Sequence, residues 1–246
     1  MMMGMSGDFI GTREAARLLG VSEASVRRWS DSGILQSHRV GRRSERRFER
    51  YAVLRLKAGG RPGASPSAKS VLLEGREIPV HAHLSSYYTN DRGRLRLSVP
   101  FLRDGLAAGQ PCVLVSDRQT ARLLEDELKA EGVAVERAIE TGRLLVLEPF
   151  KTPGQGIETF EHAFAALTRR GDLVIRVLGE PSQVAKWLGA IPDLLRFEDM
   201  LNGLVRRYPV VMLCQYDVRR MGGTEVIDVL KLHADNFDQP LGMFLN

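Results

Sequence analysis

The apolar positions after residue 78 fall into two alternating patterns, short unbroken runs and longer stretches with helical spacing. The runs predict strands at 80–87, 111–116, 143–148, 173–179 and 208–216. The spaced stretches predict helices near 94–108, 118–130, 157–170, 182–206 and 224–234. Strands that are buried on both faces and separated by helices pair in parallel. We therefore expect a three-layer α/β domain with a mostly parallel sheet.

The start of the chain carries a different pattern. Thr12 can cap a helix with apolar residues at helical spacing that ends at Gly20, and Ser22 can cap a second helix that runs through Trp29. Two helices joined by a tight turn form a helix-turn-helix. Beyond them, the pattern predicts a strand at 34–40, a basic turn at 41–47 and a third helix at 49–57.

A segment that cannot pack separates these two parts. Residues 58–70, AGGRPGASPSAKS, contain three Gly, two Pro and three Ser, and no apolar residue larger than Ala. Such a composition is typical of a flexible linker. We therefore expect a small domain at 8–57, a linker at 58–70 and a larger domain at 71–246.

Basic residues are concentrated at the start of the chain, although the net charge of the whole is only +5. Residues 8–57 contain 12 Lys and Arg against 6 Asp and Glu, and residues 58–70 add two more basic residues. The rest of the chain holds 21 basic and 24 acidic residues. This asymmetry is typical of a nucleic-acid-binding module joined to a domain with another task. We expect double-stranded DNA as a partner.

The stretch TREAARLLGVSEASVRRWSDSGIL, followed by RRF at 46–48, resembles the DNA-binding module of the MerR family and, more closely, its BldC-like and excisionase-like versions. The resemblance covers residues 8–57 and implies a winged helix-turn-helix. Two features depart from the family pattern. RSE at 43–45 stands where typical members carry Gly and His, and the Gly-Pro linker replaces the dimerisation helix. Any dimerisation must then come from the larger domain or from cooperative binding on DNA.

The residues expected to contact DNA lie at the exposed start of the second helix and on the wing. Such helices meet base edges in the major groove, and wing arginines reach phosphates or the minor groove. The predicted set is Thr12, Ser22, Glu23, Ser25, Arg27, Arg28, Arg39, Arg42, Arg43, Arg46 and Arg47.

The larger domain resembles a second family. HAHLSSYY, FLRDGLAAGQPCVLVS, GRLLVLE, VIRVLGE, FEDMLN and LCQYD, with His233 after them, are similar to the MEDS domain, the sensory domain of DcmR-type regulators of methylotrophs and methanogens. This resemblance implies a RecA/KaiC-like architecture and the role of a sensor joined to a DNA-binding module.

Several polar residues are embedded in the apolar elements of this domain, and buried polar groups need partners or a ligand. Ligands of such folds bind beyond the carboxyl ends of the strands. We therefore expect a pocket for an unidentified small-molecule effector, lined by His81, His83, Tyr87, Arg176, Glu198, Tyr216, Asp217 and His233. A polar layer whose members satisfy one another is the alternative.

Other chemistry finds less support in the sequence. The turn YTNDRG lacks the glycines, the lysine and the hydroxyl of a phosphate-binding loop, which argues against ATP hydrolysis. A degenerate RecA-like nucleotide-binding module tethered to DNA is one alternative function. His81 and His83 share one strand face, and Cys214, Glu198 or His233 could complete a metal site. No ligand-pair spacing supports that site, so we expect no metal and no cofactor. A metal-sensing regulator is the second alternative.

The remaining expectations concern activity and location. No nucleophile elbow is present, and both cysteines lie in apolar runs, so we expect no enzyme. The chain has neither a run of about 18 apolar residues nor a signal-like start, which favours a cytoplasmic protein without a membrane partner. Self-association, where it occurs, is expected through the sensory domain.

Overall fold

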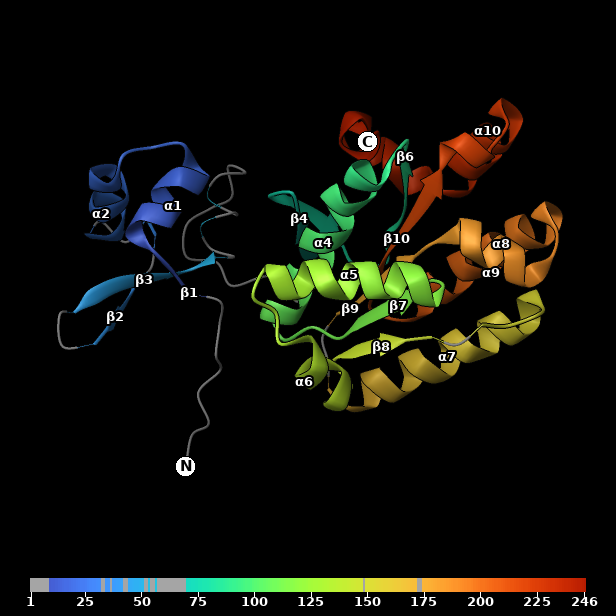
Figure 1. Cartoon of the computed structure of the whole chain (residues 1–246), viewed down its shortest axis with the longest axis horizontal. Coiled ribbons are helices and arrows are strands. Elements are labelled where there is room, and N and C mark those ends of the chain that lie inside the picture. Colours follow the sequence, from blue (N-terminus) through green and yellow to red (C-terminus); the bar gives the residue numbers. More distant parts are fainter. Residues whose placement is uncertain are drawn as a thin grey trace. The chain divides into compact units, whose positions relative to one another are not determined.

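The computed structural model describes residues 9–31, 34–35, 37–41, 44–50, 53, 56, 70–147, 149–171 and 174–246. The chain divides into two compact units, Met1–Glu77 and Ile78–Asn246 (Figure 1). Each unit is described below by itself.

The smaller unit packs two helices on a three-stranded antiparallel sheet. Its helices are α1 (Thr12–Leu19) and α2 (Glu23–Asp31), and its strands are β1 (Phe9–Gly11), β2 (His38–Val40) and β3 (Glu45–Glu49), in the order β1-β3-β2. Ala15 and Ala16 of α1, Val26 of α2 and Phe48 of β3 are fully or almost fully buried in one cluster. This burial fixes α1 against α2 and confirms the predicted helix-turn-helix.

The turn between the two helices forms as its residues predict. Gly20 ends α1 with φ 68°, in the left-handed region that favours glycine, and its N–H bonds to carbonyls of the last turn. The hydroxyl of Ser22 accepts a hydrogen bond from the N–H of Ser25 at 3.1 Å and so caps α2.

Several details of the smaller unit differ from the prediction. Gly11, not Thr12, is the N-cap of α1, and no side chain caps that end. The strand predicted at 34–40 begins only at His38, and the charged segment predicted as a turn forms β3, because its backbone pairs with both β1 and β2. The predicted helix at 49–57 is described only at Arg50, Val53 and Leu56, which are helical, and residues 58–69 lie outside the described part.

The larger unit is built on a five-stranded parallel sheet. Its strands are β6 (His83–Tyr88), β7 (Cys112–Val115), β8 (Leu144–Val146), β9 (Ile175–Gly179) and β10 (Val210–Asp217), in the order β6-β10-β9-β7-β8. Almost every strand residue is buried, which explains the unbroken apolar runs in the sequence.

Helices cover both faces of this sheet. They are α4 (Asp91–Ala107), α5 (Arg118–Ala130), α6 (Val135–Glu140), α7 (Pro153–Arg169), α8 (Pro181–Leu188), α9 (Ile191–Arg207) and α10 (Gly223–Leu232). In Figure 1, α5 lies above β7 and β8, and α7 lies below them. The predicted three-layer α/β arrangement is therefore confirmed. No described helix is long and apolar enough to cross a membrane.

Three features between residues 70 and 246 were not predicted. The helix expected at 182–206 is two helices, because Gly189 adopts φ 85° and Pro192 restarts the chain as part of α9. The short helix α6 follows α5. A hairpin of β4 (Ser70–Leu73) and β5 (Arg76–Pro79) precedes the sheet, and β4 begins at the last residue assigned to the linker.

The edge strand β6 is closed by side chains from a segment far along the chain. The carboxylate of Asp235 accepts from the N–H of His83 at 2.7 Å. Asn236 accepts from the N–H of Ser85 and donates to its carbonyl, both at 2.7 Å. The 3-10 helix η2 (Ala234–Asp238) thus supplies the hydrogen bonds that a further strand would make.

Candidate functional site

The exposed start of α2 forms the candidate surface for reading DNA. Ser22 and Ser25 bring their hydroxyls within 3.0 Å of each other, and Arg28 reaches the Ser25 hydroxyl at 3.4 Å. Arg27 pairs with Glu23, one turn earlier, at 2.9 Å. All five side chains are exposed or half-buried. Hydroxyls, a carboxylate and guanidinium groups at the start of such a helix match the donors and acceptors on base edges.

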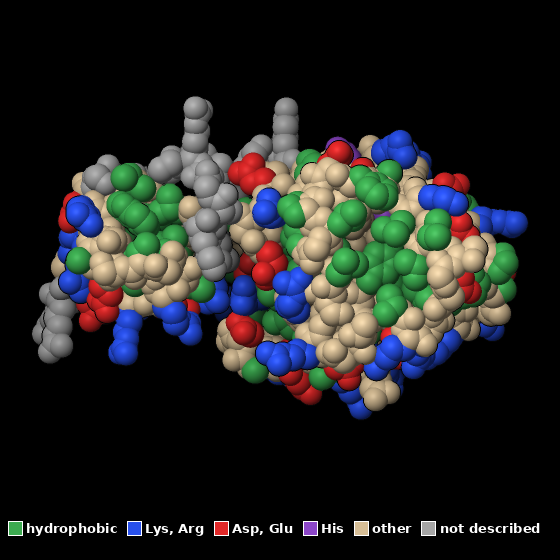
Figure 2. Space-filling view, turned by 90° about the horizontal axis from the view of Figure 1, so that it is seen from above, with side chains coloured by type: hydrophobic (Ala, Val, Ile, Leu, Met, Phe, Trp, Pro, Cys, Tyr) green, Lys and Arg blue, Asp and Glu red, His purple; other side chains and the backbone are tan. Residues whose placement is uncertain are grey.

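The hairpin of β2 and β3 carries the wing arginines. Arg39 is exposed and donates to a backbone carbonyl of the hairpin turn at 3.0 Å. Arg47 pairs with Glu45 at 3.2 Å and keeps 40% of its side chain exposed. Figure 2 shows basic side chains standing out from the smaller unit. Arg42 and Arg43 lie outside the described residues.

Arg46 differs from the other predicted DNA contacts because its guanidinium is engaged inside the unit. It donates to the backbone carbonyl of Arg27 at 2.8 Å and to the carboxylate of Asp31 at 2.6 Å, and only 15% of its side chain is exposed. It therefore ties the wing to α2. Thr12, the first residue of α1, is half-buried.

A cluster of four buried side chains lies between the sheet and the helices on one of its faces. His83 comes from β6, Cys214 from β10, Glu198 from α9, and His233 from the end of α10. One side-chain atom from each lies within 4.8 Å of all the others, and no side chain is more than 2% exposed. We call these four residues the His-Cys-Glu cluster.

The sheet register and the helix period bring this cluster together. His83 pairs with Met212 across β6 and β10, so Cys214 projects from the same face two residues further along. On α9, Glu198 and Asn202 are one turn apart and both reach His83.

The outer ring nitrogens of both histidines are held by hydrogen bonds that fix the tautomers. His233 Nδ1 lies 2.8 Å from the carbonyl oxygen of Val229, which only accepts, so Nδ1 carries the proton. Asn202 donates its amide to Leu232, so its oxygen faces His83 Nδ1 at 3.0 Å and accepts there. In the neutral rings, both Nε2 lone pairs point into the cluster.

Burial governs the ionisation of the cluster. It lowers the pKa of His233, and the neighbouring His83 lowers it further. Burial would raise the pKa of Glu198, but contacts with His233 and His83 outweigh it and hold that pKa at about 2. Burial and the Glu198 charge together raise the pKa of the Cys214 thiol well above its usual value. The cluster thus combines a carboxylate and a protonated thiol with two imidazole rings.

Two tyrosines extend the polar region along the same sheet face. Tyr87 stacks on Tyr216 with ring centroids 5.8 Å apart, and Tyr216 contacts the His233 ring edge-on at 5.8 Å. The Tyr87 hydroxyl accepts from Ser85 at 3.0 Å. The buried Tyr216 hydroxyl has no hydrogen-bond partner among the described residues. Burial and the nearby Glu198 raise its pKa well above the usual value.

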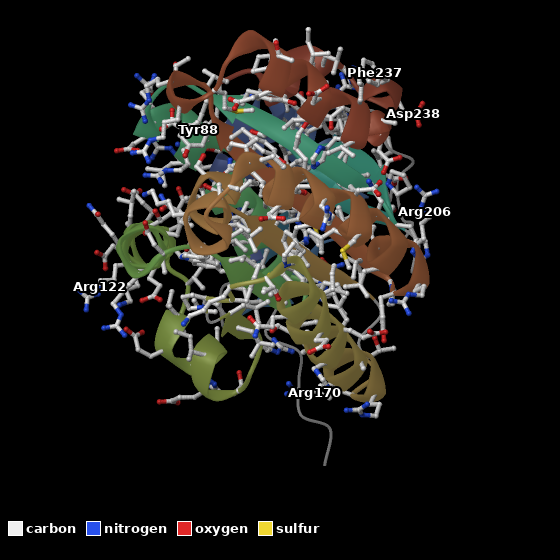
Figure 3. The ribbon with its side chains drawn as sticks, turned by 90° about the vertical axis from the view of Figure 1, so that its right-hand side faces the viewer. Tyr88, Arg122, Arg170, Arg206, Phe237 and Asp238 are labelled. Carbon is white, nitrogen blue, oxygen red and sulfur yellow. The ribbon has the colours of Figure 1, made fainter. Side chains whose placement is uncertain are left out.

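A second site, an open cleft of about 850 Å³, lies at the carboxyl ends of the strands. Figure 3 shows two of its lining residues, Tyr88 and Arg122, on the same side of the larger unit. Basic residues outnumber acidic ones in the lining: Arg94, Arg118, Arg122, Lys186, Arg219 and Arg220 against Asp91, Asp117, Asp126 and Asp217. The first residue of α4 and the first residue of α5 line it too, so the positive ends of two helix dipoles face the cleft.

Two polar side chains are not fully satisfied by protein contacts: Arg94, which lines the cleft, and Glu180, which contacts the lining residue Tyr88. Arg94 donates to Asp91 at 2.6 Å, but its buried Nε has no partner among the described residues. The Tyr88 hydroxyl donates to one carboxylate oxygen of Glu180 at 3.1 Å, and the second oxygen has no partner there. Burial raises the pKa of Glu180 to about 8. Unsatisfied buried polar atoms beside an open cleft are typical of a binding site.

The eight residues predicted to line one pocket are distributed over different places. His83, Tyr87, Glu198, Tyr216 and His233 come together in and beside the His-Cys-Glu cluster.

The other three lie elsewhere. Arg176, fully buried on the opposite sheet face, donates to the carbonyl of Phe101 and to the side chain of Gln110. Asp217 lines the cleft and pairs with Arg219. His81 precedes β6 and contacts the carbonyl of Val205.

Cys214 of the cluster and the neighbouring Asn202 were absent from the predicted pocket. The apolar neighbours of Cys214 in the sequence favoured a buried thiol, although Cys214 was also considered as a possible metal ligand. Asn202 orients His83 and lies four residues after Glu198, a spacing that places both on one helix face. The four-residue spacing of Glu198 and Asn202 was the signal that the sequence offered. It identifies a site only when β6, the strand that both residues contact, is known.

Comparison with known proteins agrees with both parts of the structure. Residues 82–234 match the family model described as MEthanogen/methylotroph, DcmR Sensory domain, abbreviated MEDS. Residues 9–61 match a family model described as a helix-turn-helix domain. Over 95% of its length, the chain is 32% identical to a protein named transcriptional repressor DcmR from Methylorubrum extorquens, of which it covers 93%.

Proposed function

Because the chain belongs to the MEDS (methanogen/methylotroph, DcmR sensory domain) family and carries a helix-turn-helix domain, we propose that it is a DNA-binding transcriptional repressor controlled by a small molecule. The name of the similar Methylorubrum protein supports repression. A chromosomal target places its action in the cytoplasm, and the role is that of a regulator rather than an enzyme.

The DNA-binding part rests on the α2 surface and the wing. An exposed Ser22–Ser25–Arg28 group stands at the start of the second helix, and a hairpin with exposed arginines follows it. We propose on this basis that the module is of the winged MerR or BldC type, with α2 in the major groove and the wing on the backbone. Phosphate contacts by the wing then give affinity, and α2 gives sequence preference.

Selection from a randomised duplex pool tests this proposal. The full-length protein should enrich a sequence motif, and Arg28→Ala should lose most of that enrichment. Arg137→Ala is the matched control, because Arg137 is an exposed arginine on α6 of the larger unit, and it should enrich the same motif as wild type. Enrichment by Arg28→Ala equal to wild type would show that α2 does not read the bases.

The cleft carries the effector proposal. Its lining has more basic than acidic residues, two helix N-termini face it, and Arg94 presents an unsatisfied buried N–H beside it. We propose that the effector is a small anion that binds there. By binding one conformation of the larger unit more tightly than another, such an anion changes the affinity of the protein for DNA. Tyr87 and Tyr216 of the predicted pocket are buried, whereas the cleft is open to solvent.

A panel of phosphate, acetate, malonate and succinate tests the effector proposal. At least one anion should raise the melting temperature of the larger unit and change the Kd for the selected DNA. Arg94→Gln should lose both responses, whereas Arg170→Gln, on the surface at the end of α7, should keep them. If no anion changes melting or DNA binding, the cleft is not the effector site.

A nucleotide is the second candidate occupant, because the cleft has the position that nucleotides take in open α/β sheets. Asn90 caps the start of α4, and Gly93 in its first turn is the single glycine there, in place of a phosphate-binding loop. ATP in the same melting experiment distinguishes the two: stabilisation by ATP and not by the smaller anions favours the nucleotide.

Self-association through the larger unit completes the proposal. Ile227, Phe237 and Leu245, on α10 and after it, are 54%, 61% and 63% exposed. Figure 2 shows hydrophobic side chains gathered on the face of the larger unit seen from above. A Phe237→Asp variant should have a lower sedimentation coefficient than wild type if this face joins two copies. Equal coefficients would place any dimer contact elsewhere.

A further inference from the structure

We propose that the His-Cys-Glu cluster is a metal site for a divalent first-row transition ion, with zinc as the best fit. His83 Nε2 lies 3.3 Å from both Cys214 Sγ and Glu198 Oε2. Glu198 Oε2 lies 3.6 Å from Cys214 Sγ and from His233 Nε2. Tetrahedral zinc with ordinary Zn–N, Zn–O and Zn–S bonds separates its ligand atoms by about 3.3–3.7 Å.

The hydrogen-bond count inside the cluster favours a cation. The two Nε2 atoms and the Glu198 oxygen present lone pairs, and the Cys214 thiol supplies one weak donor. When both rings are neutral, these three acceptors and one donor cannot satisfy one another in a region shielded from water. A metal ion accepts all four lone pairs at once and offsets the buried carboxylate charge.

The surroundings of the four residues match those of metal ligands. Each histidine donates its other ring nitrogen to an oxygen, His83 to Asn202 and His233 to Val229, which orients the ring and raises its basicity. When the ion binds, the Cys214 S–H bond breaks, the sulfur electron pair forms the bond to the metal, and the proton is released to solvent.

The ligand set indicates a structural or sensory ion rather than a catalytic one. All four positions of a tetrahedron are filled by protein atoms, and the ligands are at most 2% exposed, so no open position faces a substrate. The ion would join β6, β10, α9 and the end of α10. His233 directly precedes η2, so bound metal would also hold the segment that covers β6.

Direct metal titration of the full-length protein tests the site. Chelator-treated protein is titrated with zinc and with cobalt, and bound metal is measured by elemental analysis. About one ion per chain is expected. Cobalt should give the strong visible bands of tetrahedral coordination and a thiolate-to-cobalt charge-transfer band in the near ultraviolet.

Two cysteine variants identify the ligand. The chain has only two cysteines, and Cys112 lies on the opposite sheet face against the carbonyl of Leu102. In Cys112→Ser, the remaining thiol is Cys214, and the charge-transfer band should persist. In Cys214→Ser the band should vanish. A band that vanishes in Cys112→Ser, or wild-type protein that binds no stoichiometric ion, overturns the proposal.

Two histidine variants provide an independent comparison. His233→Gln should weaken zinc binding at least tenfold, as loss of one ligand requires. His81→Gln should bind zinc as wild type does, because His81 contacts Val205 outside the cluster. Far-ultraviolet circular dichroism checks that both variants fold. Equal zinc affinity of folded His233→Gln and wild type would exclude His233 as a ligand.

Discussion

Arg46 of the wing is bonded to Asp31 at the end of α2, with 2.6 Å between guanidinium and carboxylate. A second bond to the carbonyl of Arg27 makes this a two-point attachment between the hairpin and the helix. The attachment fixes the angle at which wing and helix are presented. A residue that a sequence predicts as a phosphate contact thus has a positioning role within its own module.

Separate substitution of Arg46 and Arg47 distinguishes positioning from phosphate contact. Arg46→Ala should lower the free energy of unfolding of the smaller unit by about 1 kcal/mol, because two hydrogen bonds are lost. Arg47→Ala should leave stability within about 0.5 kcal/mol and reduce the salt slope of DNA binding by about one. Urea unfolding and DNA titrations at several salt concentrations measure both. Equal stability of Arg46→Ala and wild type would remove the positioning role.

Glu180 makes the stability of the larger unit depend on pH. Its pKa rises from 4.5 to about 8 on folding, so the unfolded chain ionises first. Folding then costs the free energy of keeping this carboxyl protonated or burying its charge. This cost is absent below about pH 4.5, grows as the pH rises to about 8 and stays constant above it. Glu180→Gln removes the ionisation and should gain stability over wild type, on the order of a few kcal/mol, between about pH 5 and pH 9.

Urea unfolding of the larger unit at several pH values measures that difference. Glu136→Gln is a matched control, because Glu136 is exposed and pairs with Lys129 on the surface. It should change stability little at any pH. A wild-type-minus-Glu180→Gln difference that stays constant with pH would contradict the buried ionisation.

Two helical glycines should respond in opposite ways to alanine. A Cβ at Gly105 of α4 would lie 2.5 Å from Arg176 Cδ and 2.8 Å from Cys112 Sγ, both buried. Gly105→Ala should therefore destabilise the larger unit by about 1–3 kcal/mol. At Gly203 of α9 no described atom lies within 4 Å of the added carbon, and Gly203→Ala should stabilise by about 0.5–1 kcal/mol. Thermal unfolding of both variants checks the sign of each change.

Metal removal should destabilise the larger unit if the His-Cys-Glu cluster holds an ion. At free zinc about a thousandfold above Kd, the linked stabilisation is about 4 kcal/mol. A chelator should therefore lower the melting temperature of zinc-loaded wild type and of Cys112→Ser. It should have little effect on Cys214→Ser. The same decrease in Cys214→Ser would assign the effect to another part of the chain.

The fold was predictable where one pattern dominates. Parallel strands buried on both faces give apolar runs such as VVMLC at 210–214, and such runs identified every strand of the main sheet. The charged strand β3 was not predictable, since its pairing with β1 and β2 outweighs the turn-like composition. The end of α8 at Gly189 falls inside a stretch that was interpreted as a single helix. The helical spacing of its apolar residues alone does not show where that helix ends.

The site was predictable only in part, because it depends on contacts far apart in the chain. His83 and Cys214 are brought together by the pairing of β6 with β10, 131 residues apart. The alternation of side chains along a strand shows which sheet face each one occupies. It does not show which other strand lies beside it. Arg176 is a second example, because its position inside the apolar run 173–179 did not reveal that it bonds to the carbonyl of Phe101 on α4.

The edge of β6 is covered in two ways: the main chain of Asn246 bonds to Tyr87 near its end, whereas side chains of Asp235 and Asn236 cover His83 and Ser85 near its start. At the start of the strand, the protecting groups are therefore side chains that a single rotation about Cα–Cβ withdraws. Without these side-chain hydrogen bonds, the N–H and C=O groups there would be unpaired, and a strand from another molecule could pair with them. In a damaged protein, the start of β6 would therefore be a starting point for aggregation.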